Sequence, residues 1–171
     1  MSRPDFLAES LGHWRYIRDG LIAEADNIPA DKYDFRPTPE VKSVHELVQH
    51  ILQGSMMMVG ELTREKPNFQ RMSFSAFFEE YASRATEAEG KDALIGLLKR
   101  QMEEGMAAFT KLGNEAMKEP ITNFDGSQWS RMQWFFHSMT EEMYHRGQLT
   151  TYARLMGLVP ALTQRIERNS E

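Results

Sequence analysis

Four long stretches of the chain carry apolar side chains at intervals of three and four residues, which is the spacing of one face of an α-helix. They cover roughly residues 5–26, 43–64, 92–112 and 130–156. Ser43 and Glu46 form a capping-box pattern at the start of the second stretch. Gly113 and Gly157 are placed to end the third and the fourth. The pattern predicts an all-α chain with four long helices.

The segments between these stretches indicate how the helices are connected. Residues 27–42 contain three prolines, which exclude a long helix and predict an extended crossover along the bundle. Residues 73–88 are rich in phenylalanine and predict a short extra helix, and a polar loop precedes the last helix, which Ser127 or Ser130 caps. Such an order is typical of a four-helix bundle, and we expect the up-down-down-up type in a single domain over residues 1–171.

The composition excludes several classes of protein. The net charge is -5 and no basic run is present, so we expect no nucleic-acid partner. There is no cysteine, which excludes disulfides, zinc ribbons, iron–sulfur clusters and a cysteine nucleophile. No stretch approaches the roughly 18 apolar residues of a membrane span, and the first ten residues lack the apolar core of a signal peptide. We therefore expect a cytoplasmic protein without a membrane partner.

The last helix is apolar on two sides, which a helical projection separates. One side holds Met132, Phe135, Phe136, Met139 and Met143, and the other holds Trp134, Leu149, Tyr152 and Met156. A helix of this kind either packs on a partner subunit as well as on the core, which predicts a homodimer, or is buried in the bundle most of the way round. The sequence favours neither explanation over the other.

A constellation of histidine and glutamate on the last helix indicates a metal site. Glu141 and His145 are four residues apart, so their side chains share one face of the helix and can grip one ion. His137 lies another four residues back, and His50 on the second helix is the best candidate for the third ligand. The alternative is a surface pair between Glu141 and His145 or Arg146, with each histidine in an ordinary hydrogen-bonding role.

Two segments carry a more specific signal. Residues 43–51 read Ser-Val-His-Glu-Leu-Val-Gln-His-Ile, and residues 145–149 read His-Arg-Gly-Gln-Leu. Together with Arg36-Pro37 and the closing Arg-Leu-Met-Gly at 154–157, they resemble the DinB/YfiT-like family of metal-dependent four-helix-bundle proteins. That family is unrelated to the DNA polymerase that shares the DinB name. The resemblance spans nearly the whole chain in helix order.

The resemblance implies a divalent ion held by three histidines, one from the second helix and two, four apart, from the last. The first maps onto His50 and the last onto His145, but the middle position holds Glu141 instead of histidine. Two histidines and one carboxylate still suit zinc or nickel, with manganese or iron as alternatives. The departure equally fits a decayed site, and His137 could serve as an additional or replacement ligand. Position 142 is a glutamate, and the resemblance implies that family members frequently have an acidic residue there.

The family's characterised members imply a thiol-dependent transferase or isomerase that acts on a small-molecule substrate. Because this chain has no cysteine, the thiol would be an external low-molecular-weight one, and the favoured reaction is S-transfer in detoxification or stress response. A metal-dependent hydrolase using activated water is one alternative. A non-enzymatic dimeric binding or stress protein with a vestigial site is the other. Trp134 and Tyr152 are candidates for the pocket wall, although core packing is the favoured role for both.

Overall fold

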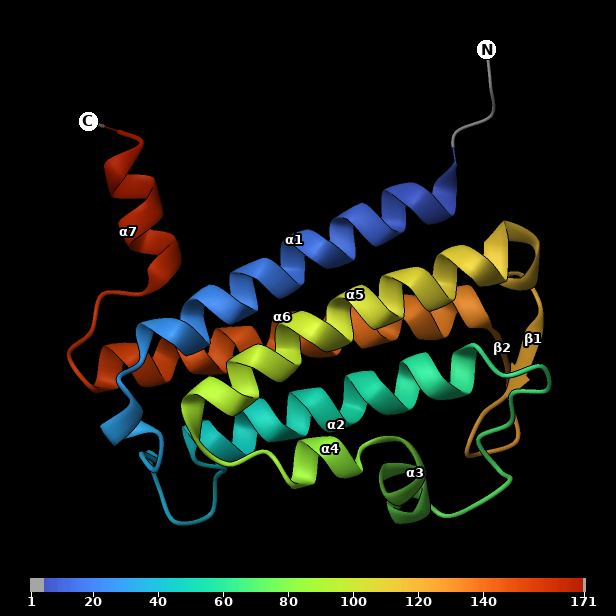
Figure 1. Ribbon diagram of the computed structural model, residues 1–171, viewed down its shortest axis with the longest axis horizontal. Helices are drawn as coiled ribbons and strands as arrows, with labels where there is room; N and C mark the ends of the chain where they lie inside the picture. Colours follow the sequence, from blue (N-terminus) through green and yellow to red (C-terminus); the bar gives the residue numbers. More distant parts are fainter. Residues whose placement is uncertain (1–4, 171) are drawn as a thin grey trace.

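Four long helices form the body of the molecule in the computed structural model, which describes residues 5–170. They are α1 (Phe6–Asn27), α2 (Val44–Leu62), α5 (Gly90–Ala116) and α6 (Arg131–Leu155). As Figure 1 shows, α1 and α6 run in one direction and α2 and α5 run in the other, which is the up-down-down-up order. The predicted all-α four-helix bundle is therefore confirmed.

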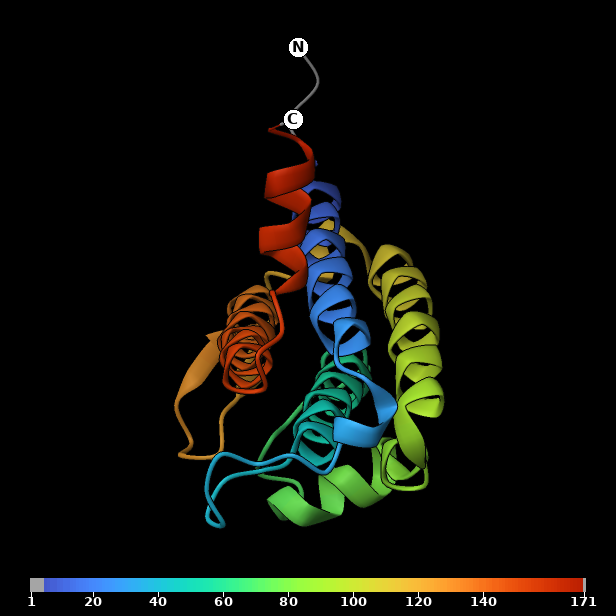
Figure 2. The ribbon, with the colours of Figure 1, turned by 90° about the vertical axis from the view of Figure 1, so that its left-hand side faces the viewer.

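The helices that follow one another at the start of the chain lie on opposite corners of the bundle. Helix α1 packs against α5 and α6, and α2 packs against the same two helices. The view along the bundle in Figure 2 shows this arrangement, with α1 and α2 at opposite corners. The chain crosses the end of the bundle between α1 and α2, with one 3-10 turn at Ala30–Lys32, and does not run along the bundle as predicted. The connection that runs along the bundle is instead residues 63–89, which include α3 and α4, because α2 and α5 point in the same direction.

The helix ends follow the signals in the sequence. Ser43 and Glu46 form the predicted capping box at the start of α2. Ser130, rather than Ser127, caps α6, and Gln133 completes a second capping box with it. Gly113 adopts a positive φ of 81° and interrupts α5, so the main part of that helix ends where the sequence predicts.

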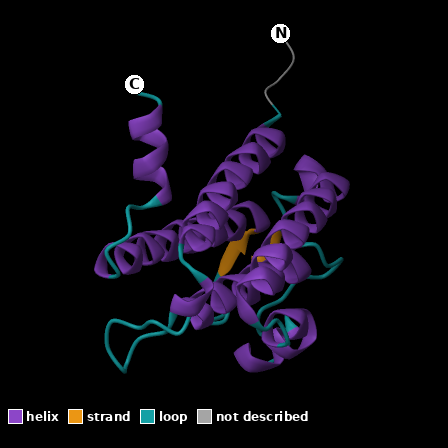
Figure 3. Cartoon of the chain, turned by 60° about the vertical axis from the view of Figure 1, so that its left-hand side comes forward, coloured by secondary structure: helices purple, strands orange, loops and turns teal. Residues whose placement is uncertain are grey.

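Two other connections also differ from the prediction. The polar loop before α6 contains a small antiparallel hairpin, β1 (Pro120–Thr122) and β2 (Gln128–Ser130), with Gly126 at positive φ in its turn. Each strand has only three residues, too few to show an alternating pattern. The two strands of the hairpin are drawn in orange in Figure 3. The predicted extra helix over residues 73–88 is in fact two helices, α3 (Phe74–Tyr81) and α4 (Ser83–Thr86), which Figure 1 labels.

A further helix that the sequence analysis missed, α7 (Ala161–Arg168), follows α6 and projects away from the bundle (Figure 1). None of its residues is buried. The buried carboxylate of Glu24 in α1 anchors its first turn by accepting hydrogen bonds from the backbone N–H groups of Ala161 and Leu162. The short exposed helix was missed because it buries no apolar face that would impose a long pattern.

The core consists of two apolar clusters, one at the crossover end and one at the hairpin end. A layer of buried polar side chains lies between them, and each long helix contributes one member. The members are Arg18, Ser55, Gln101 and Glu142. Buried polar groups are tolerated when they are hydrogen-bonded. In this layer the Arg18 guanidinium donates hydrogen bonds to the side chains of the other three members.

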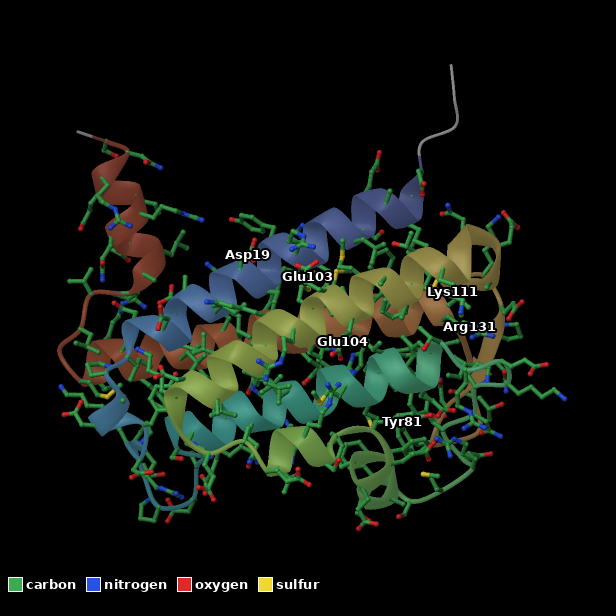
Figure 4. All side chains as sticks on the ribbon, viewed as in Figure 1. Asp19, Tyr81, Glu103, Glu104, Lys111 and Arg131 are labelled. Carbon is green, nitrogen blue, oxygen red and sulfur yellow. The ribbon has the colours of Figure 1, made fainter. Side chains whose placement is uncertain are left out.

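Charged side chains tie the outer elements to the bundle, and several are labelled in Figure 4. Neighbouring Glu103 and Glu104 on α5 form separate ion pairs, with Arg15 of α1 and with Arg84 of α4. Arg131, at the start of α6, donates hydrogen bonds to the last carbonyl groups of α2 and its following loop. In residues 5–170, no helix is both long and apolar enough to cross a lipid bilayer.

Part of the two-sided apolar surface of α6 remains exposed. Phe135 and Met139 are buried, whereas Phe136 and Met143 keep 38% and 45% of their surface exposed. Phe6 of α1 packs edge-on against Phe136 at the rim of a groove between the two helices. The homodimer suggested by this surface stays a prediction.

Candidate functional site

Two half-buried histidines from different helices meet where α2 and α6 pack against each other. His50 lies in the second turn of α2 and His145 lies in α6, and the two helices pack directly against each other. Their ring centroids are 5.0 Å apart and the ring planes are nearly perpendicular, at 85°. The structure therefore brings together the two histidines for which the sequence predicts a common ion.

A hydrogen bond fixes the orientation of His145. Its Nδ1 lies 2.8 Å from Oε1 of Gln148, one turn further along α6. A carbonyl oxygen can only accept, so Nδ1 is the donor in this contact, which leaves Nε2 to act as a metal ligand in that tautomer. Metal-ligating histidines are commonly held in this way, with the second ring N–H donated to an oxygen. In His145 the available Nε2 faces Glu141, whose Oε2 is 3.6 Å away.

The environment of His50 favours its neutral form. The ring is half-buried, and burial is the main reason that its pKa is lowered from the usual 6.5. The nearby rings and charges of His145 and Lys42 lower the pKa further, and Glu141 opposes them. A neutral imidazole is the form that can coordinate a metal ion, so His50 is suited to be a ligand.

Glu141 and His137 lie beside this pair and are more accessible. The Glu141 side chain is 52% exposed, and its Oε1 lies 4.0 Å from Nε2 of His137, one turn earlier in α6. The His137 side chain is 40% exposed and its ring packs against the rings of Trp129 and Trp134. The structure thus places Glu141 between the two histidines of its own helix.

In the part of the chain that the structure describes, no group of three His, Asp or Glu side chains stands ready to hold a metal ion. The residues nevertheless fit one chemically, because two imidazoles and one carboxylate are a competent donor set for zinc or a similar divalent ion. His50 is favoured in its neutral form and His145 has its tautomer fixed. Glu141 is the most exposed member of the set.

The histidines form one wall of a cavity of about 290 Å³. Its other walls are mainly apolar and come from α2, α3, the hairpin and α6. The side chains that form them are Met57, Met58, Phe74, Phe78, Phe124 and Trp134. Trp134, 7% exposed, thus both packs in the core and lines the cavity. Tyr152 does not line it, and its hydroxyl donates to the backbone oxygen of Lys42.

Behind Glu141, the next residue along α6 is the buried end of an ion pair. Glu142 accepts hydrogen bonds from Arg18 through both carboxylate oxygens, at 2.6 and 2.8 Å. Trp14 Nε1 donates to the same carboxylate at 2.9 Å. Both glutamates line the cavity, but the Glu142 side chain is only 3% exposed and is already paired with Arg18, whereas the Glu141 side chain is 52% exposed.

Of the aromatic residues that line the cavity, sequence reasoning named only Trp134 and missed the phenylalanines. Phe74 and Phe78 are four residues apart and share one face of α3, which is a signal that could have identified them as a surface pair. Phe124 lies in a hairpin turn, where no periodicity marks its direction. The buried role of Glu142 was also missed, because a carboxylate beside Glu141 in sequence gives no sign of a partner on another helix.

The fold and the pocket define a helical-bundle protein in which histidines of the second and last long helices share a mainly apolar cavity. The chain belongs to the DinB family, whose family model matches residues 1–169. The resemblance seen in the sequence is therefore confirmed. No match was found among curated proteins.

Several solved structures share the fold. The DinB-like protein YjoA of Bacillus subtilis is 23% identical, with a TM-score of 0.66, over 87% of this chain and 92% of that one. YfiT of Bacillus subtilis, described as a probable metal-dependent hydrolase, is 16% identical, with a TM-score of 0.64, over 92% and 91%. A mycothiol-dependent maleylpyruvate isomerase is 17% identical, with a TM-score of 0.68, over 84% of this chain but 60% of the isomerase. At these identities the likeness establishes the fold.

Proposed function

We propose that this chain is a metal-dependent transferase that joins a low-molecular-weight thiol to an electrophilic small molecule, as in detoxification or stress response. The observation that carries the proposal is the meeting of His50 and His145 on one wall of an apolar cavity, with Glu141 beside them. These three residues would hold zinc or nickel, with manganese or iron as alternatives. His137 is a further or replacement ligand, since it also contacts Glu141.

A bound divalent ion would lower the pKa of a thiol or water attached to it, so that a nucleophile is available near neutral pH. The chain has no cysteine, so the thiol belongs to a second small molecule. In the reaction a bond forms between the thiol sulfur and an electrophilic carbon, the leaving group departs with its electron pair, and the thiol proton is released. His137 lines the cavity and is 40% exposed, so it would accept that proton when it is not itself a metal ligand.

Each alternative rests on its own observation. The hydrolase alternative would use the same cavity with activated water, and it is favoured by the fold shared with YfiT. The vestigial alternative, a non-enzymatic binding or stress protein, is favoured by the lack of a ready group of three ligands among residues 5–170. The thiol-dependent proposal is favoured by the fold shared with the mycothiol-dependent isomerase. The mainly apolar wall of the cavity also suits an organic substrate.

The test is a conjugation assay with protein purified without a histidine tag and loaded with zinc or nickel. Monochlorobimane serves as the electrophile, and mycothiol, glutathione and cysteine are offered as thiols. We expect conjugation with at least one thiol above the rate of the free reaction, lost in His145→Ala and kept in His45→Ala, a control on α2 outside the cavity. Hydrolysis of ester or amide substrates without conjugation would overturn the proposal in favour of the hydrolase. Failure to bind any metal would favour the vestigial alternative.

A further inference from the structure

Four aromatic rings from three separate segments form a chamber at the end of the cavity away from the paired histidines. Phe74 and Phe78 come from α3, Phe124 comes from the hairpin turn and Trp134 comes from α6. Ring centroids are 4.7 Å apart between Phe74 and Phe78, 5.7 Å between Phe74 and Phe124, and 6.3 Å between Phe124 and Trp134. We call these four residues the aromatic chamber.

The rings of the chamber are incompletely covered by the protein itself. Phe74 is 50% exposed and Phe124 is 40% exposed, although both touch other aromatic rings. Several exposed aromatic side chains that line the same cavity are typical of a ligand site, whereas single exposed rings scattered on a surface are not. The chamber therefore offers apolar surface that a bound molecule would cover.

Gly54 keeps space open between the chamber and the histidines. It lies one turn after His50 on α2, so the two residues share a face of the helix, and both line the cavity. A Cβ atom added at Gly54 would meet nothing within 4 Å. Glycine destabilises a helix interior relative to alanine, and packing does not require it here. The missing side chain leaves room for a ligand next to His50.

We propose that the aromatic chamber binds an uncharged aromatic group of the electrophilic substrate, and that Gly54 sets the size of the group admitted. The substrate role rests on the proposed transferase function, whereas the binding of an aromatic molecule does not. Rings at these separations, in edge-on and tilted contact, can receive another ring by its face or its edge. The ring would lie in the chamber while its electrophilic carbon faces the histidines.

The size and charge of the cavity support this choice of ligand. At about 290 Å³ it is close to the lower end of ligand pockets, roughly 300–1,000 Å³, so it suits a molecule of one or two rings. None of the four chamber side chains is ionisable, and the ionisable groups of the cavity are its histidines and glutamates. Glu142 among these is already neutralised by Arg18. An anionic group in the chamber would lose its hydration without gaining a partner among the four rings.

The binding test uses N-phenyl-1-naphthylamine, an uncharged fluorescent probe, titrated into the full-length protein with and without added zinc. We expect saturable binding to the wild type in both conditions. Gly54→Leu should weaken binding by at least about tenfold, because the new side chain occupies the open space, and Phe74→Ala should weaken it less. Phe74 is half-exposed, so its truncation leaves the core intact.

Two control variants separate these effects from changes in folding. Gly12→Leu places the same side chain at a glycine of α1 where an added Cβ also meets open space, and Phe6→Ala removes an exposed ring outside the cavity. Both controls should bind the probe like the wild type. Equal affinity of Gly54→Leu and the wild type would overturn the chamber as the binding site.

A pair of competing ligands tests the preference for aromatic groups. We expect 2-naphthol to displace the probe at lower concentration than decahydro-2-naphthol, which has a similar outline but no π-system. Equal or better displacement by the saturated alcohol would overturn the aromatic assignment. Probe binding by protein that takes up no metal would support the chamber and contradict the transferase proposal. Metal uptake without probe binding would contradict the chamber as a binding site and leave the transferase proposal standing.

Discussion

The rings of His50 and His145 meet edge to face, 5.0 Å apart, although one belongs to α2 and the other to α6. The contact arises because these helices pack side by side. Burial favours the neutral form of the first ring, and Gln148 sets the tautomer of the second. Two imidazoles with a carboxylate beside them are a competent donor set for a divalent ion.

Replacing Glu141 by histidine should strengthen metal binding. Position 141 lies one turn before His145, so Glu141→His would place two imidazoles four residues apart on one helix face, an arrangement that grips zinc. We expect zinc affinity to rise by about tenfold or more, measured by competition with a chromophoric chelator. Glu141→Gln should lower the affinity, because an amide is a weaker ligand than a carboxylate. Unchanged affinity in both variants would show that position 141 is not a ligand.

The ion pair between Arg18 and Glu142 should be a major contributor to stability. Both side chains are buried, with 0% and 3% of their surface exposed. Arg18→Met would leave Glu142 buried with only Trp14 as a donor, so we expect the free energy of unfolding to fall by about 3–5 kcal/mol in urea denaturation.

Arg15→Met is the matched control for this prediction. Arg15 lies one turn earlier on α1 and forms an ion pair with Glu103, but their side chains are 40% and 64% exposed. An exposed pair contributes little, so we expect a loss of at most about 1 kcal/mol. Equal losses in Arg15→Met and Arg18→Met would contradict the structural importance of the buried layer.

Acid should loosen the attachment of α3, which carries two rings of the aromatic chamber. The Arg71 guanidinium holds the pKa of Glu80 below its usual value of 4.5, with 2.7 Å between their closest atoms. The unfolded chain therefore binds this proton more readily than the folded chain. The contribution of Glu80 to stability is present above its unfolded pKa and is lost as the pH falls through its folded pKa.

Glu80→Gln should thus lose less stability than the wild type between about pH 5 and about pH 3, as measured by urea denaturation at each pH. Glu79→Gln is the control, since Glu79 is exposed and forms no ion pair in the described part of the chain. An acid response of Glu80→Gln identical to that of Glu79→Gln would argue against this assignment.

Much of the bundle could be predicted because its signals are local. The apolar spacing of the long helices, the Ser43–Glu46 capping box and Gly113 each act within a few residues of the feature that they specify. The three-residue strands and α7 were missed, and the break between α3 and α4 was not predicted, because elements so short give too few residues for a clear periodic pattern. Their positions depend on tertiary contacts, such as those that Glu24 makes with the start of α7.

In the candidate site, too, the residues with local signals could be predicted and those brought together by tertiary packing could not. His50 could be selected from the sequence because it lies at the edge of an apolar stripe, and His145 because it lies four residues after Glu141. Each also lies within a segment that resembles a known family. The chamber could not be selected from the sequence, since Phe74, Phe124 and Trp134 are brought together only by the packing of three segments. Likewise, Arg18 and Glu142 are polar residues on otherwise buried faces, and only the fold reveals that each is the partner of the other.

The most direct test of the account is the zinc content and affinity of tag-free protein, measured by elemental analysis and by chelator competition. We predict one zinc ion bound per chain in the wild type, an affinity reduced by at least about tenfold in His50→Ala, and an unchanged affinity in His45→Ala on the same helix. Equal zinc affinity in the wild type and His50→Ala, or no zinc uptake by the wild type, would contradict the account.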